Sequence, residues 1–251
     1  MVAQYRNAGR LYSYALVACV AYAILTTAVI GHFIGQKGGI DYVLEKLGLG
    51  TAVIPRTPMY QEQLERFPYY PDHARDIVFV GDSLISSLNW GEYYTHIRNR
   101  GVGSDTSAGV MARLRPIRDM APSKVFLGIG TNDLAQEIEP AVVARNIRTM
   151  ARDLRNDGAE VYVISILPIN LAYDNQILLR RKAAQIVGLN RMLKSQARES
   201  GYIFLDLYPH FADEAGNLKG HYTTDGLHLT EAGNARFAAL VRPYLADAAQ
   251  P

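Results

Sequence analysis

The chain has 251 residues, of which 49% are hydrophobic and 20% are charged, which suits one globular domain of about 200 residues plus an appendage. The 26 basic and 24 acidic residues leave a net charge of +2 without a prominent basic block, so no nucleic-acid partner is expected. Cys19 is the single cysteine and the six histidines are scattered, which excludes an intramolecular disulfide and a Cys/His zinc cluster.

An apolar segment without any Asp, Glu, Lys or Arg covers residues 11–34. A helix rises about 1.5 Å per residue, so this segment is long enough to cross a hydrocarbon core of roughly 30 Å. We predict that it is a transmembrane signal anchor, which leaves residues 1–10 as a cytoplasmic N-terminus. The alternatives are a cleaved secretory signal, a buried helix and a lipoprotein signal, because residues 16–19 (LVAC) are similar to a lipobox.

The charges on either side of this segment indicate its orientation. Arg6, Arg10 and the α-amino group precede it, whereas the residues after it carry charges of both signs. Positive residues are retained on the cytoplasmic side, so we expect a single-pass membrane protein whose chain after about residue 36 is extracytoplasmic. In a Gram-negative cell this compartment is the periplasm.

Glycine and proline are frequent between residues 35 and 58, which predicts a juxtamembrane linker. A short helix is expected within it, around residues 42–47, and a second helix around residues 60–67. The second helix leads into a main domain that we assign to residues 59–251.

Short apolar runs of strand length recur through the main domain, as expected for buried parallel strands. They cover residues 77–80, 125–129, 161–164 and 202–205, and residues 97–102 (IRNRGV) are a further candidate strand with fewer apolar residues. Amphipathic helical stretches alternate with them, over residues 108–120, 141–156, 178–200 and 231–246. This alternation predicts an α/β fold, a three-layer α/β/α sandwich with a five-stranded parallel sheet. Ligands bind at the carboxyl ends of the strands in such sheets, so the chemistry is expected there.

Polar residues follow three of these strands. Ser83 comes after the first strand in GDSL, Ser104 after the second in GVGSDT, and Asn132 after the third in GTND. Asp225 and His228 lie three residues apart in DGLHLT, ahead of the last helix. Each residue alone can have a structural role such as a helix cap, but the predicted fold brings all of them to one edge of the sheet.

These residue types supply the parts of a serine-hydrolase site. A serine hydroxyl needs a base to take its proton, and an imidazole suits that role when a carboxylate holds it in one tautomer. We predict Ser83 as the nucleophile, His228 as its base and Asp225 as the residue that orients the base. The backbone N–H groups of Ser83 and of the 103–104 turn, with the side-chain amide of Asn132, can stabilise the oxyanion.

Other polar residues near these positions have weaker claims. Asp82 and Asp133 are expected to brace loops by hydrogen bonds. The segment 168–181 follows the fourth strand and is a candidate substrate loop. Its candidate polar contacts are Asn170, Tyr173 and Asp174. The adjacent Arg180 and Arg181 are expected on a solvated helix face.

Four ordered sequence blocks resemble the GDSL, or SGNH, hydrolase family of esterases and lipases. The blocks are DIVFVGDSL (76–84), NRGVGSDT (99–106), KVFLGIGTND (124–133) and DGLHLT (225–230). They are similar to the branch of platelet-activating-factor acetylhydrolase subunits and bacterial acyl-esterases, and the resemblance covers roughly residues 58–246. It implies a flavodoxin-like SGNH fold, a triad of Ser83, Asp225 and His228, and oxyanion donors at Ser104 and Asn132.

The second block departs from the family pattern. The family's usual phrase is Gly-Gly-Asp, and its second glycine donates a backbone N–H to the oxyanion, whereas this chain has Ser104 at that position. A serine keeps the backbone N–H, but a non-glycine residue with a positive φ is strained. Gly103 is the alternative donor.

Together these inferences predict a membrane-anchored serine esterase that removes acyl groups, of acetyl size, from a carbohydrate or lipid ester. The alternatives are an O-acyltransferase with the same triad, and an accessory subunit bound to a partner in a membrane complex of an envelope or exopolysaccharide system. No metal and no organic cofactor are expected, because the triad supplies both nucleophile and base.

Overall fold

The computed structural model describes residues 16–17, 19–32, 57–70, 73–90, 94, 96–178 and 180–245. Contacts within the chain divide it into two compact units, Met1–Thr51 and Ala52–Pro251. In the first unit, residues 16–17 and 19–32 are helical and nearly all of them are exposed. Among the described residues, no helix has both the length and the apolar character needed to cross a membrane. The rest of the predicted anchor over residues 11–34, and the helix predicted around residues 42–47, lie outside the described residues.

The second unit is built on a five-stranded parallel sheet with the strand order β2-β1-β3-β4-β5. The strands are β1 Ile77–Gly81, β2 Ile97–Gly101, β3 Lys124–Gly128, β4 Glu160–Ile164 and β5 Ile203–Leu205. The register pairs Gly81 with Gly101 on one side and with Gly128 on the other, so β1, β2 and β3 end at the same level. The predicted five-stranded parallel sheet is therefore confirmed, and its strand order is the flavodoxin-like one.

Helices connect and flank these strands. They are α3 Pro58–Arg66, α4 Ser83–Ser86, α5 Ser107–Ala112, α6 Leu114–Asp119, α7 Thr131–Ala135, α8 Pro140–Asn156, α9 Ala183–Ser200, α10 Tyr208–Phe211 and α11 Glu231–Val241. Short 3₁₀ turns are η1 Phe67–Tyr69, η3 Gln176–Leu178, η4 Gly220–Tyr222 and η5 Arg242–Tyr244. The side chains of Thr106 and Thr230 accept backbone N–H groups at the starts of α5 and α11, which satisfies donors that have no partner within the helix.

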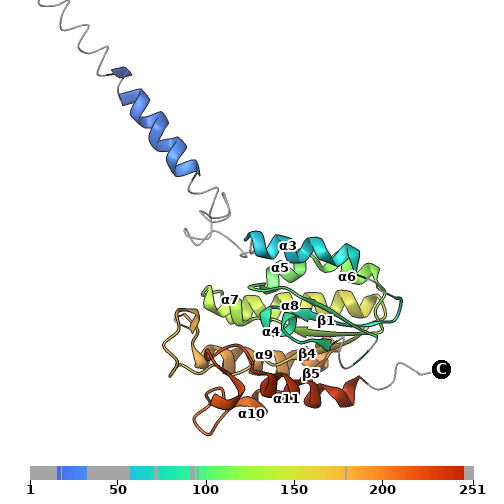
Figure 1. The fold of residues 1–251 in the computed structure, drawn as a ribbon. Helices are drawn as coiled ribbons and strands as arrows, with labels where there is room; N and C mark the ends of the chain where they lie inside the picture. The colour runs from blue at the N-terminus through green and yellow to red at the C-terminus, as the bar shows by residue number, and fades with distance from the viewer. Residues whose placement is uncertain are drawn as a thin grey trace, which may run out of the picture. The chain divides into compact units, whose positions relative to one another are not determined.

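Successive residues of the strands face two separate hydrophobic clusters, as the pleat of a strand requires. Val78 and Val125 belong to one cluster, which is completed by residues of α5, α6, α8 and α9. Phe79 and Phe126 belong to the other, which is completed by residues of α4, α10 and α11. Figure 1 shows α5 and α6 on one side of the strands and α11 on the other. The sheet is thus the middle layer of an α/β/α sandwich.

Three predicted helices have different limits in the structure. The helix expected over residues 108–120 is divided at Arg113 into α5 and α6, because Pro116 has no N–H to donate to the carbonyl one turn earlier. The helix expected from residue 178 begins only at Ala183, since the backbone of Lys182 is extended. The last helix ends at Val241, and a 3₁₀ turn that contains Pro243 follows it.

Candidate active site

Ser83 lies in the first turn of α4, two residues after the carboxyl end of β1. Asp82 caps this helix, because its Oδ1 accepts a hydrogen bond of 3.0 Å from the N–H of Leu84. Asp82 is buried, whereas Ser83 is half-buried. The strand and the cap therefore hold Ser83 at the edge of the sheet with its side chain only partly covered, and Asp82 has the bracing role predicted for it.

The side chains of Ser83, His228 and Asp225 form a chain of polar contacts. Ser83 Oγ lies 3.1 Å from His228 Nε2. On the other side of the ring, His228 Nδ1 lies 2.6 Å from Asp225 Oδ2. A carboxylate can only accept a hydrogen bond, so Nδ1 carries the proton and Nε2 is left with a lone pair directed at the serine hydroxyl. This is the arrangement that a general base for Ser83 needs.

The loop that carries Asp225 and His228 is fixed by its own backbone. Asp225 Oδ1 accepts N–H groups from Leu227 at 2.9 Å and from His228 at 2.7 Å, and Thr223 Oγ1 accepts the N–H of Gly226 at 2.9 Å. Burial raises the pKa of the Asp225 carboxyl, but the bonds from the His228 ring and from these N–H groups outweigh it and hold that pKa below its ordinary value. Asp225 is therefore charged at neutral pH and can orient His228 as an anion.

Ser104 has the backbone conformation that the family pattern would assign to glycine, with a φ of +64°. The preceding N–H, that of Gly103, donates a 2.7 Å hydrogen bond to Gln63 Oε1 in α3. The N–H of Ser104 makes no hydrogen bond within the described part of the chain. Of the two candidate donors in this turn, Gly103 is engaged and Ser104 is available.

The side chain of Asn132, in the first turn of α7, is held at both ends. Its Oδ1 accepts a hydrogen bond of 2.8 Å from Arg181 Nη2, and its Nδ2 donates one of 2.9 Å to the carbonyl oxygen of Asp105. Arg181 is buried, and it also donates to Thr131 Oγ1 at 3.2 Å and to the carbonyl of Ile177. These contacts fix which end of the amide is nitrogen and leave one N–H of Nδ2 for a ligand.

A cleft of about 610 Å³ joins these groups. It is lined by Met59, Ser83, Gly103, Ser104, Asn132, Ala135, Gln176, Ile177, Arg180, Arg181, Leu227 and His228. The lining brings together the predicted Ser83, Ser104, Asn132 and His228, with Asp225 behind the histidine. The lining residues that the structure describes include two arginines and no carboxylate. The size of the cleft suits a small ester substrate.

Comparison with known proteins places the chain in a family. The sequence model of the GDSL-like lipase/acylhydrolase family matches residues 79–236. The chain belongs to this family. Esterase TesA of Pseudomonas aeruginosa is 27% identical over 190 residues, which cover 68% of this chain and 88% of that protein. Platelet-activating factor acetylhydrolase IB subunit alpha1 of Homo sapiens is 29% identical over 170 residues, covering 64% of this chain and 71% of that protein.

The fold agrees with solved structures. A GDSL-like lipase from Bacteroides thetaiotaomicron superposes with a TM-score of 0.68 at 22% identity, over 76% of this chain and 98% of the other. Membership in the GDSL-like family identifies the protein as a carboxylic ester hydrolase. Helix α3 precedes the region that matches the family.

The candidate substrate loop of this GDSL hydrolase has two different parts. Gln176, Ile177, Arg180 and Arg181 line the cleft, whereas Asn170, Tyr173 and Asp174 do not. The N–H of Asn170 donates to the carbonyl of Gly226 at 2.8 Å, and the Tyr173 hydroxyl donates to that of Thr223 at 3.3 Å, so these two residues support the triad loop. The expectation that Arg181 is solvated was wrong, because its guanidinium turns inward to Asn132.

Carboxylates are buried beneath the site. Asp133 accepts hydrogen bonds from the N–H and the hydroxyl of Ser107, and Asp105 pairs with Arg113 at 2.7 Å. Burial raises the pKa of both groups. Burial also raises the pKa of Asp82 to about 7, against the hydrogen bond from Leu84. In the described residues, no group of three or more His, Cys, Asp or Glu side chains is arranged to hold a metal ion.

Two residues that contact the candidate oxyanion donors, or the turn that carries them, were not predicted from the sequence. Gln63 lies forty residues from its partner Gly103, and Arg181 lies 49 residues from Asn132. Neither residue stands in a motif, and an arginine pair or a glutamine on a helix is usually solvated. Only the tertiary fold brings them to the site.

Proposed function

We propose that this protein is a membrane-anchored serine esterase that hydrolyses acyl esters, of acetyl size, of a carbohydrate or lipid. The observation that carries the proposal is the contact of Ser83 Oγ with His228 Nε2 at 3.1 Å, with Asp225 2.6 Å from the opposite ring nitrogen. The cleft around Ser83 supplies the space for an acyl group and part of an alcohol.

In the first half of the proposed reaction, Ser83 Oγ attacks the ester carbonyl carbon and its proton passes to His228 Nε2. The carbonyl electrons move to the oxygen, which becomes an oxyanion facing the N–H groups of Ser83, Ser104 and Asn132. The charged Asp225 stabilises the imidazolium. The tetrahedral intermediate then collapses, the ester C–O bond breaks, and His228 gives its proton to the leaving alcohol.

In the second half, water replaces the alcohol. His228 Nε2 takes a proton from water as its oxygen attacks the acyl carbon, and a second oxyanion occupies the same donors. The bond from the acyl carbon to Ser83 Oγ breaks, the serine recovers its proton from His228, and the carboxylic acid leaves. The proton transfers of both halves use Ser83, His228 and Asp225, whose side chains form a chain of contacts.

The triad assignment is tested by the variant Ser83→Ala with p-nitrophenyl acetate. We expect turnover to fall on the order of 10⁵-fold, and we expect a fluorophosphonate to label the natural protein at Ser83 but not the variant. Undiminished turnover in the variant, or labelling at another serine, would refute the assignment.

The anchor is supported by the run of residues 11–34 without Asp, Glu, Lys or Arg, and by exposed apolar side chains such as Leu16, Ile24 and Val29 in its helical part. A catalytic domain held at the outer face of a membrane meets envelope lipids and glycans before it meets soluble metabolites. The proposed topology has the N-terminus in the cytoplasm and the catalytic domain outside it.

Extraction of membranes tests the anchor. We expect the full chain to stay with the membranes after an alkaline carbonate wash and to be released by detergent. Protease added to intact spheroplasts should digest the catalytic domain. Release by carbonate, or protection from protease in intact spheroplasts, would contradict the anchor or its orientation.

A second candidate function is O-acyl transfer with the same triad. The protein would act either alone or as an accessory subunit of an exopolysaccharide system. The cleft of about 610 Å³ is larger than an acetyl group needs, so an acceptor hydroxyl has room beside the acyl-enzyme. Incubation with an acyl donor and a polysaccharide distinguishes the two reactions. Acylated polysaccharide indicates transfer, and free acid alone indicates hydrolysis.

A further inference from the structure

Helix α3 lies before residues 79–236, which the family model matches, yet its side chains contact the cleft and the loop that carries Ser104. Met59, in its first turn, lines the catalytic cleft. The side chain of Gln63, one turn later, reaches the 103–104 turn, and that of Tyr60 reaches Asp105. One short helix thus contacts the cleft and the loop that carries Ser104.

The bond from Gly103 N–H to Gln63 Oε1 is the shortest of these contacts, at 2.7 Å. It engages the Gly103 N–H, which is the alternative oxyanion donor in this turn. It also fixes the peptide between Val102 and Gly103, one residue before Ser104, whose φ of +64° is unfavourable for a residue with a side chain. Gln63 therefore holds the turn in the conformation that presents the Ser104 N–H.

Tyr60 acts indirectly on Asn132, the side-chain donor of the proposed oxyanion site. Its hydroxyl, which is buried, donates a 3.2 Å hydrogen bond to Asp105 Oδ1. The backbone carbonyl of the same Asp105 accepts the 2.9 Å bond from Asn132 Nδ2. Tyr60 and Arg113 hold the two oxygens of the Asp105 carboxylate, so the position of Asn132 depends on a residue that α3 helps to fix.

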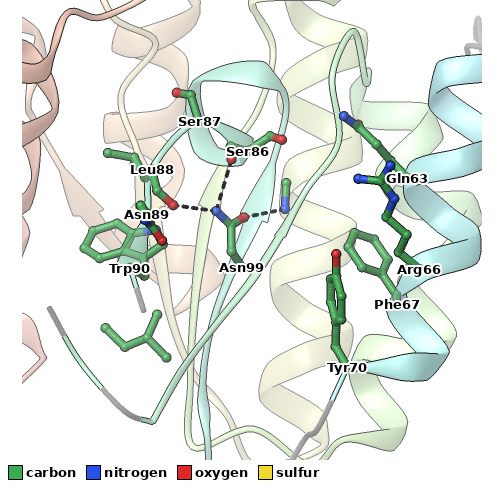
Figure 2. Close-up of a pocket in the computed structure, with 12 residues that line it drawn as sticks. Gln63, Arg66, Phe67, Tyr70, Ser86, Ser87, Leu88, Asn89, Trp90 and Asn99 are labelled. Atoms are coloured by element: carbon green, nitrogen blue, oxygen red, sulfur yellow. Dashed lines mark hydrogen bonds between the residues drawn. The ribbon is translucent and has the colours of Figure 1, made fainter. Parts of the chain in front are cut away.

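The side chain of Gln63 is not surrounded by other residues on every side. It borders a second pocket of about 360 Å³, away from Ser83. Figure 2 shows Gln63, Arg66, Phe67 and Tyr70 on one side of this pocket and the residues around Leu88 and Trp90 on the other. With open space on one side, the hydrogen bond to Gly103 is what keeps the Gln63 side chain in place.

We propose that α3 is part of the oxyanion site of this enzyme, with Gln63 and Tyr60 as positioning residues for Ser104 and Asn132. The inference rests on the proposed function, because it assigns the two residues to the oxyanion of that reaction. Neither residue touches the substrate. Their loss should raise the barrier to the chemical step and leave substrate binding nearly unchanged.

The first test is Gln63→Leu, which keeps the size of the side chain and removes the acceptor. On p-nitrophenyl acetate we expect kcat to fall about tenfold while KM stays within about twofold. Gln61→Leu is the matched control on the exposed face of the same helix and should behave as the natural protein does. If Gln63→Leu keeps the natural kcat, or loses kcat only in proportion to the folded fraction, the inference is overturned. Failure of the natural protein to hydrolyse the ester would refute the proposed function instead.

The second test is Tyr60→Phe, which removes only the hydroxyl. We expect kcat to fall about threefold in the natural background and not to change further in Asn132→Ala, because Tyr60 acts through Asp105 on that amide. Equal losses in both backgrounds would show that Tyr60 acts elsewhere and would overturn its assignment. The Gln63 test does not depend on this outcome.

Discussion

Asn132 can offer only one N–H to a ligand, because its other polar groups are engaged by Arg181 and by the carbonyl of Asp105. An amide that turned over would present its oxygen to the developing oxyanion and repel it. Arg181 has no acceptor atom, so its bond to Oδ1 excludes that orientation. The orientation of one amide is thus set by a buried cation that lies 49 residues away in the chain.

Replacing Arg181 by methionine should expose this dependence. We expect Arg181→Met to lower kcat by about tenfold to a hundredfold, less than the full loss of an oxyanion donor. In the Asn132→Ala background the same change should cost less than about twofold, since the amide that it orients is gone. Lys182→Met is the control at the adjacent exposed position. Independent, additive losses would contradict a role through Asn132.

Arg180 adds an exposed positive charge to the lining of the cleft. Unlike Arg181, it is exposed, and it makes no hydrogen bond or ion pair with any residue that the structure describes. We expect Arg180→Gln to lower kcat/KM for the anionic ester 4-acetoxybenzoate about threefold, as for an exposed ion pair. The value for neutral p-nitrophenyl acetate should stay within about twofold. Arg191→Gln, at an exposed position outside the cleft lining, is the control. Equal effects on both esters would contradict this expectation.

The loop from Thr223 to His228 is held in one conformation by hydrogen bonds within the loop. Its hydrogen bonds join the carboxylate of Asp225 to N–H groups of the same loop. Gly226 makes this turn possible with a φ of +86°, and a Cβ there would lie 2.6 Å from the carbonyl oxygen of Asn170. The acid and the base are therefore placed together by one backbone conformation.

A methyl group at this position should damage both stability and activity. We expect Gly226→Ala to lower the free energy of unfolding by about 1–3 kcal/mol and to reduce kcat, because Asp225 and His228 shift together. Gly188→Ala is the control: Gly188 lies inside α9, and a Cβ there meets nothing within 4 Å. That change should stabilise the protein by about 0.5–1 kcal/mol. Urea unfolding distinguishes the two, and a neutral Gly226→Ala would contradict the prediction.

The strands and most helices could be predicted because their signals are local. Apolar runs identify β1, β3, β4 and β5, and helical periodicity identifies α8, from neighbouring residues alone. The local signal of β2 is weaker, because its sequence IRNRG contains two arginines and an asparagine. The helix predicted over residues 178–200 begins only at Ala183, because the backbone of Lys182 is extended. The side-chain contact of Arg181 with Asn132 has no counterpart in the helical periodicity of this segment. The division at Arg113 has a local cause in Pro116, but an amphipathic pattern continues across it.

The residues proposed for the chemistry could be found in the sequence more readily than the residues that contact them. Ser83 and Asn132 stand in short blocks at strand ends, and Asp225 and His228 stand in one short block ahead of α11. Gln63 and Arg181 act over long sequence separations, and no pattern of neighbouring residues marks them. Side-chain contacts of this kind depend on the packing of complete helices, which periodicity does not specify.

Burial of carboxylates should make stability depend on pH. The pKa of Asp82 rises from its ordinary 3.8 to about 7 in the folded protein. Between these values the folded state binds more protons than the unfolded state, so this group makes stability fall as pH rises, by at most about 1.4 kcal/mol per pH unit. Asp105 and Asp133 contribute in the same direction.

The variant Asp82→Asn tests this effect, since its Oδ1 can still cap α4. We expect the variant to gain stability relative to the natural protein as pH rises from about 4 to about 7, and the difference to be constant above that range. Urea unfolding at several pH values measures it. Parallel curves for the two proteins would show that Asp82 does not titrate in this range.

The contact between Ser83 and His228 joins residues 145 positions apart, whereas Asp225 and His228 are only three apart. The acid–base pair can form early from a local turn, but the serine meets its base only when nearly the whole domain has closed around the sheet. Reaction of Ser83 with a fluorophosphonate would then count fully folded molecules. Along a urea titration, the labelled fraction should follow cooperative unfolding of the sheet, so one reagent can report both folding and catalytic competence.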